Sequence, residues 1–249
     1  MMAANTDSNG ERDKKSHAVL DIESRRRKAA LIIDLIQSNV GPLSAMDVLE
    51  IGTGSGYISA IIAPNCRSFV SVDIVDERKD HSFRFQTVTS EILPFSEGSF
   101  DLVVSNHVIE HVDDQPAHLR EAWRVLRAGG AVYLSTPNRY TLNEPHFRLP
   151  FLSWLPAGMR DTYVQLTKRG DKFDVQPLSR SDLRTLAESA NFTLVDIGDQ
   201  MTDRRLVEKL PMPRSVLRAA WPVVRVLAPT FVTILRPNIG DDCQERPGA

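Results

Sequence analysis

The chain of 249 residues carries 30 Lys and Arg against 32 Asp and Glu, a formal charge of −2 at neutral pH. Hydrophobic residues make up 42% and charged residues 25%, the balance of an ordinary globular protein. A general nucleic-acid binder shows a basic excess, so we expect no nucleic acid among the partners. No run of about 18 uncharged apolar residues occurs, so no membrane-spanning helix is expected.

The two cysteines, Cys66 and Cys243, are far apart and form no CxxC pair. This spacing argues against a disulfide framework and a cysteine zinc site, and we expect no metal. A reducing cytoplasm is the natural location. The polar start, MMAANTDSNGERDKK, has no apolar stretch typical of a secretory signal. We expect residues 1–20 to be disordered, residues 21–236 to form a single domain, and residues 237–249 to be a flexible tail.

Predicted strands and helices alternate along most of the domain. A helix at 22–40, with apolar residues at helical spacing, comes first. Apolar and β-branched runs then predict strands at 47–51, 68–73, 84–90, 100–106, 131–136, 192–197 and 231–235. Further helices are predicted at 57–63, 113–127 and 179–190, the last with a Ser179-x-x-Asp182 capping box. This alternation predicts an α/β fold with a largely parallel sheet covered by helices on both faces.

Two insertions interrupt the alternation. Residues 138–178 are irregular and rich in proline and aromatic residues, which favours either a lid over an acceptor or a local satellite core. Residues 200–229 form a basic, apolar insertion, and the stretch 204–236 holds seven basic residues against one acid. Its alternatives are a peripheral contact with an anionic membrane, a cap over the cleft, and a homodimer patch.

A glycine-rich loop follows the first predicted strand, and it reads Glu50-Ile-Gly52-Thr53-Gly54-Ser-Gly56-Tyr57. Glycines allow a tight turn and a close approach of the backbone to a ligand. A dinucleotide-binding loop has a small residue where Tyr57 stands, so this sequence departs from that pattern. Glu50 would suit a cationic ligand group better than a phosphate. A plain strand-to-helix turn is the alternative.

Further motifs follow at the carboxyl ends of the predicted strands, where parallel sheets bind ligands. Asp73 ends the second strand and can accept hydrogen bonds from a ribose diol. The runs LPFSEGSFDLVVSNHVIEHV and REAWRVLRAGG come next. Together with VLEIGTGSGY and SVDI, they resemble class I S-adenosylmethionine-dependent methyltransferases. The closest group includes ubiquinone and menaquinone biosynthesis methyltransferases and many small-molecule or glycan O-methyltransferases.

The resemblance implies a Rossmann-like sheet of seven strands, mostly parallel with the last strand antiparallel, and S-adenosylmethionine as the cofactor. It implies that Glu50 holds the loop and faces the cofactor's amino end. The loop itself consists of Gly52, Thr53, Gly54 and Gly56. Ribose and adenine contacts are implied for Asp73, Ile74, Thr89, Ser90 and Glu91, and contacts near the sulfur for Asn106 and His107. Thr89 is a departure, because the family usually has an aspartate there for the adenine amine.

His111 is the candidate general base, because it follows the fourth strand and its reference pKa near 6.5 suits proton transfer. A capping or hydrogen-bonding role is the alternative. Asn138, Tyr140 and His146 are further candidates from the loop after the fifth strand.

The function expected is O-methylation of a small-molecule, lipid-linked or glycan acceptor. A nicotinamide-dependent oxidoreductase and a non-catalytic cofactor-binding relative are the alternatives.

Overall fold

The computed structural model describes residues 22–89, 92–200 and 228–238. This part of the chain contains a seven-stranded sheet with the order β3-β2-β1-β4-β5-β9-β8. The strands are β1 (Asp47–Ile51), β2 (Ser68–Asp73), β3 (Arg84–Thr87), β4 (Phe100–Asn106), β5 (Leu126–Pro137), β8 (Phe192–Asp196) and β9 (Thr230–Pro237). Strands β1 to β5 pair in parallel, and β9 runs antiparallel to both of its neighbours, β5 and β8. The predicted fold is thereby confirmed.

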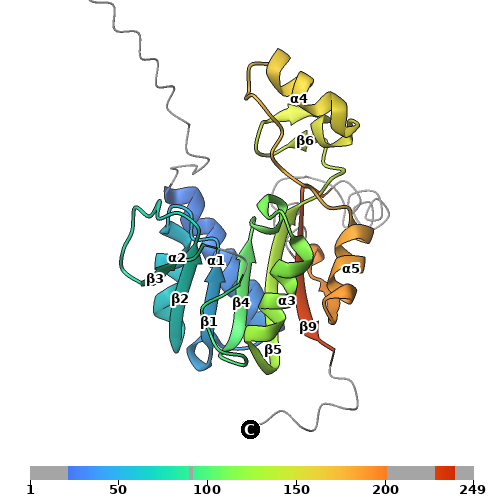
Figure 1. Ribbon diagram of the computed structural model, residues 1–249. Helices are drawn as coiled ribbons and strands as arrows, with labels where there is room; N and C mark the ends of the chain where they lie inside the picture. The colour runs from blue at the N-terminus through green and yellow to red at the C-terminus, as the bar shows by residue number, and fades with distance from the viewer. Residues whose placement is uncertain (1–21, 90–91, 201–227, 239–249) are drawn as a thin grey trace, which may run out of the picture.

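Helices cover both faces of this sheet (Figure 1). Helices α1 (Ile22–Asn39) and α2 (Tyr57–Ile62) lie on one face, and α3 (Gln115–Val125) and α5 (Arg180–Ser189) lie on the other. Side chains that alternate along each strand fill two separate cores. Val48 and Leu102 belong to the core with α1, whereas Leu49 and Val103 belong to the core with α3 and α5.

Several predicted boundaries match the structure. Strands β1, β2 and β4 begin and end at the predicted residues, and Ser179 and Asp182 form the predicted capping box. The other strands depart from the predicted bounds, β8 and β9 by only one or two residues at an end. Strand β3 ends at Thr87, and β5 begins at Leu126 rather than at residue 131. The pairing of β4 with β5 shifts after Phe100, and the left-handed φ of +78° at Gly129 accommodates the extra residues of β5 in this bulge.

The segment 138–178, which we call the lid segment, is more regular than predicted. It contains β6 (Asn143–Glu144), β7 (Leu149–Pro150) and helix α4 (Ala157–Leu166). It also has an apolar core of its own, formed by Phe147, Leu149, Leu152, Val164, Phe173 and Val175. In Figure 1 the segment stands as a separate lobe, drawn in yellow, beyond the ends of β4 and β5.

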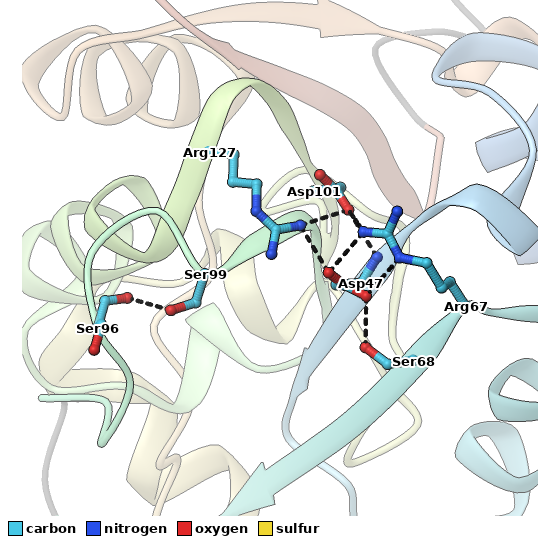
Figure 2. Close-up of polar contacts among 7 residues, drawn as sticks. All are labelled: Asp47, Arg67, Ser68, Ser96, Ser99, Asp101 and Arg127. Atoms are coloured by element: carbon cyan, nitrogen blue, oxygen red, sulfur yellow. Dashed lines mark hydrogen bonds and ion pairs between the residues drawn. The ribbon is translucent and has the colours of Figure 1, made fainter. Parts of the chain in front are cut away.

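At the amino ends of the strands, a charged network ties the sheet together (Figure 2). The guanidinium of Arg67 lies 2.6 Å from a carboxylate oxygen of Asp47 and 2.8 Å from one of Asp101. Arg127 lies 2.8 Å from each of the same two carboxylates. Hydrogen bonds from Arg67 and Ser68 hold the pKa of Asp47 well below its usual range. The network joins the start of β1 to neighbouring strands. It lies at the end of the sheet opposite to the carboxyl ends of the strands, where the site is expected.

The predictions for residues 1–20, for 201–227 of the basic insertion and for 239–249 fall outside the described residues. Among the described helices, none combines the length and apolar character needed to cross a bilayer.

Candidate functional site

The glycine loop after β1 takes the tight turn that its composition predicts. Gly52, Gly54 and Gly56 have φ values of +85°, +52° and +75°, a region that L side chains rarely adopt. A Cβ atom on Gly52 would lie 2.2 Å from Cγ2 of Val108, so no side chain fits there. A Cβ on Gly54 would meet no heavy atom of the described residues within 4 Å. The loop is thus packed on one side and open at Gly54.

Glu50 supports the loop from beneath. Its side chain is 3% exposed, and its Oε2 accepts hydrogen bonds from the hydroxyls of Ser59 in α2 and Ser71 in β2. Ser71 is in turn hydrogen-bonded to the hydroxyl of Thr53 in the loop. Burial raises the pKa of Glu50 to about 7, and the nearby charge of Asp73 adds to the rise. Nothing in the sequence motifs indicated that these two serines would donate hydrogen bonds to Glu50.

Asp73, at the end of β2, reaches across to the same loop. Its Oδ2 accepts the Gly54 N–H at 2.9 Å, and its Oδ1 accepts the Ile74 N–H at 2.8 Å. The side chain of Ile74 is 70% exposed. Thr89 is exposed two residues past the end of β3, whereas Ser90 and Glu91 lie outside the described residues.

Asn106 and His107 are placed at the end of β4. The side-chain Oδ1 of Asn106 is buried and has no hydrogen-bond partner among the described residues, which is unusual for a buried polar atom. His107 adopts a φ of +59°, a conformation costly for a residue with a Cβ. Burial lowers the pKa of the His107 imidazole.

A second group of polar side chains lies between β4, β5 and the lid segment. Glu110 is fully buried, and its Oε2 accepts a hydrogen bond of 3.0 Å from Thr136 Oγ1 in β5. From the lid segment, His146 bonds through Nδ1 to Oε1 of buried Glu144 at 2.7 Å. The ring of His111 meets the ring of His146 edge-on at 4.9 Å between centroids. The structure therefore brings His146, a secondary candidate, next to His111.

The other two candidates from the loop after β5 make contacts within the fold. Asn138 is 1% exposed; its Nδ2 donates to the Ala228 carbonyl at 2.8 Å, and its Oδ1 accepts the Tyr140 N–H at 2.9 Å. The ring of Tyr140 packs edge-on against Trp154. These contacts fix the path of the chain as it leaves β5 for the lid segment.

Comparison with known families identifies this chain. Residues 9–197 match the family model described as a methyltransferase domain, so the chain belongs to that family. The match favours the methyltransferase family over the nicotinamide oxidoreductases. The family and the names of the relatives imply S-adenosylmethionine as the cofactor.

The names of sequence relatives agree with this assignment. A Mycolicibacterium smegmatis protein named as a probable S-adenosylmethionine-dependent methyltransferase is 33% identical over 60% of this chain, and the match spans about half (53%) of its own length. A Pelagibacter ubique ubiquinone biosynthesis O-methyltransferase is 26% identical, over 79% of this chain and 86% of its own.

Among solved structures, the YcgJ protein of Bacillus subtilis superposes with a TM-score of 0.54 at 18% identity, over 86% of this chain and 100% of its own. A methyltransferase from Archaeoglobus fulgidus superposes with a TM-score of 0.52 at 16% identity, over 86% of this chain and 96% of its own. At these identities the likeness concerns the fold.

The residues at the carboxyl ends of β1, β2 and β4 fit this cofactor. The open space beside Gly54 leaves room for a ligand, and Asp73 borders the loop. The buried Oδ1 of Asn106 offers an acceptor that the described part of the chain leaves unused. These features suit a ligand that carries both a ribose and an amino group.

Proposed function

We propose that this protein transfers a methyl group from S-adenosylmethionine to a hydroxyl group of a small-molecule, lipid-linked or glycan acceptor. The observation that carries the proposal is the pair of histidines, His111 shortly after β4 and His146 in the lid segment, whose rings meet edge-on. Oxygen acceptors need a base to take their proton, and imidazole is the side chain best suited to that at neutral pH. Several relatives are named as ubiquinone biosynthesis O-methyltransferases, which agrees with an oxygen acceptor.

The cofactor supplies a methyl group already activated by the sulfonium. The proposed holding residues are the loop Gly52–Gly56 with Glu50 beneath it, Asp73 and Ile74 for ribose and adenine, and Asn106 and His107 near the sulfur. Thr89, Ser90 and Glu91 complete the proposed adenine contacts. The exposed side chain of Ile74 gives an apolar surface for a ring, and the Asp73 carboxylate already accepts one N–H of the loop.

His111 is the proposed general base. Its side chain is exposed, it ends the short 3-10 turn Ile109–His111 that comes after β4, and its ring contacts the ring of His146 edge-on. In this position it would take the proton of the acceptor hydroxyl as the oxygen attacks. The protein's further contribution is to hold the acceptor in line and to exclude water.

The lid segment is the proposed acceptor surface. Tyr140, Phe151 and Trp154 form a chain of edge-to-face contacts, and their side chains are 44%, 52% and 44% exposed. Exposed aromatic surface of this kind suits an apolar or lipid-linked acceptor. A location in the cytoplasm is part of the proposal, and residues 204–236 are proposed to cap the cleft, to form a homodimer contact or to touch a membrane surface.

The test is methyl transfer from isotope-labelled S-adenosylmethionine into extracts, with and without the membrane fraction, followed by mass spectrometry of the product. We expect label on an oxygen atom. His111→Gln should lower kcat by about 10²- to 10⁴-fold with unchanged cofactor affinity. His81→Gln, at an exposed histidine between β2 and β3, on the other side of β1 from β4 in the strand order, is the control and should retain full activity. Label on nitrogen or carbon, or full activity in His111→Gln, would contradict the proposal.

A further inference from the structure

We propose that His107, Glu110 and His146 form a binding site for a divalent transition-metal ion, with Glu144 positioning His146. One ligand atom from each of the three side chains lies within 4.8 Å of the other two. The ligands come from the end of β4 and from the lid segment, so an ion here would join the lid segment to the sheet. The sequence spacing predicts no such site, because positions 107 and 146 meet only in the folded chain.

The distance between His107 and Glu110 suits two ligands of one ion. His107 Nδ1 lies 3.2 Å from Glu110 Oε1. Oε1 is buried, and this 3.2 Å contact falls short of a well-formed hydrogen bond among the described residues. Two ligands of a tetrahedral ion with bonds of about 2.0 Å stand about 3.3 Å apart. Both atoms are therefore spaced to share a third, positively charged partner.

Contacts on its side chain and its backbone hold Glu110 in an orientation that suits a metal ligand. Its side chain is fully buried, and its other oxygen, Oε2, accepts the 3.0 Å hydrogen bond from Thr136. Its backbone carbonyl accepts the N–H of Gln176, where the chain returns from the lid segment, at 2.7 Å. A buried carboxylate oxygen whose one close contact is a poorly formed pair with His107 is costly, and a bound cation would give both atoms a full partner.

Glu144 gives His146 the environment of a metal ligand. The bond between Glu144 Oε1 and His146 Nδ1 leaves Nε2 as the nitrogen for an ion. The second oxygen of Glu144 accepts the Phe147 N–H at 2.6 Å, so the carboxylate, which is 2% exposed, cannot rotate freely. In zinc sites, the nitrogen of a ligating histidine that faces away from the ion usually donates to a carboxylate or a carbonyl.

The donor set selects the class of ion. Two imidazoles and one carboxylate suit zinc and similar divalent transition metals, whereas magnesium and calcium prefer oxygen ligands. Three protein ligands also leave a position open, as in catalytic sites. Resting on the proposed function, we infer that the acceptor hydroxyl takes this open position. There the ion would polarise the hydroxyl oxygen for attack on the methyl group.

The experiment measures metal binding by the full chain, without substrate. The protein is freed of metal with a chelator and titrated with Co²⁺, whose visible absorption reports coordination by nitrogen and oxygen. We expect one Co²⁺ per chain, displaced by Zn²⁺, and a rise in melting temperature on binding. Glu110→Gln and His146→Ala should abolish the signal. Glu144→Gln should weaken affinity by about 10- to 100-fold.

His81→Ala controls for adventitious binding to an exposed histidine and should bind Co²⁺ like the unaltered protein. Binding of S-adenosylhomocysteine verifies that each variant is folded. No Co²⁺ uptake by the unaltered protein, or equal uptake by Glu110→Gln and His146→Ala, would overturn the site. Methyl transfer that persists in chelator would overturn only the acceptor's position on the ion. Absence of methyl transfer with Co²⁺ bound would count against the proposed function and leave the site standing.

Discussion

The open side of the glycine loop allows a matched pair of substitutions. Gly54 and Gly98 both have left-handed backbones, with φ of +52° and +63°, and in both a Cβ would meet no described heavy atom within 4 Å. Gly54 lies in the loop after the carboxyl end of β1, whereas Gly98 precedes the amino end of β4, its parallel neighbour, so the two glycines lie at opposite ends of these strands. The two positions therefore share the same backbone constraint and differ in their nearness to the proposed cofactor.

Alanine at either position should lower the stability only through the strain of its left-handed backbone conformation. A residue with a Cβ in this region costs about 1–2 kcal/mol. For a chain of this length, each kcal/mol lowers the melting temperature by about 2–4 °C, so we expect losses of about 2–8 °C in Gly54→Ala and in Gly98→Ala. Neither contains a steric clash that would add to this cost.

Substitution by arginine should affect cofactor binding at Gly54 and not at Gly98. Gly54→Arg would carry a long side chain into the space beside the loop and should weaken binding of S-adenosylhomocysteine at least tenfold, about 1.4 kcal/mol. Gly98→Arg should bind it like the unaltered protein. Calorimetric titration gives the affinities, and thermal unfolding gives the stabilities. Unchanged affinity in Gly54→Arg, with the fold retained, would refute the placement of the cofactor beside this loop.

Three further predictions concern stability. Gly52→Ala should cost more than about 3 kcal/mol in the free energy of unfolding, because its Cβ would lie 2.2 Å from the Val108 side chain; a loss no larger than that of Gly54→Ala would contradict this. Burial raises the pKa of Glu50 to about 7, above the unfolded value near 4.3, so the folded chain binds the extra proton between these pH values. Stability should therefore fall as pH rises through that window, by up to about 1.4 kcal/mol per pH unit; denaturant unfolding of Glu50→Gln should lack this slope, and an identical slope would disprove the assignment. Because the pKa of Asp47 is lowered, its stabilisation is present above pH 4 and is lost as pH falls; Asp47→Asn should melt at a lower temperature than the unaltered protein at pH 7, and the difference should shrink in acid.

The central strands could be predicted from the sequence because each is a short apolar run whose ends are marked by neighbouring turn residues. The apolar runs of β1, β2 and β4 are short, are bounded by turn residues, and begin and end as predicted. The capping box of α5 is likewise a pattern within four residues, Ser179 to Asp182. The start of β5 was missed because its first residues pair through a bulge with β4, which depends on a neighbouring strand.

Contacts between distant positions could not be predicted in this way. The network of Asp47, Arg67, Asp101 and Arg127 joins residues up to 80 positions apart (Figure 2). Helix α4 was missed because the prolines and aromatic residues of the lid segment hide its weak pattern. A Glu-x-His spacing at positions 144 and 146 was the one local signal for their pairing, and only the fold places it beside β4.

The central claim is that the carboxyl ends of β1, β2 and β4 hold an S-adenosylmethionine-type cofactor. Titration calorimetry of the unaltered protein with S-adenosylmethionine, S-adenosylhomocysteine and NADH tests it most directly. The account predicts one site per chain for the first two ligands and no measurable binding of NADH. Tight binding of NADH, with none of either sulfur compound, would contradict it.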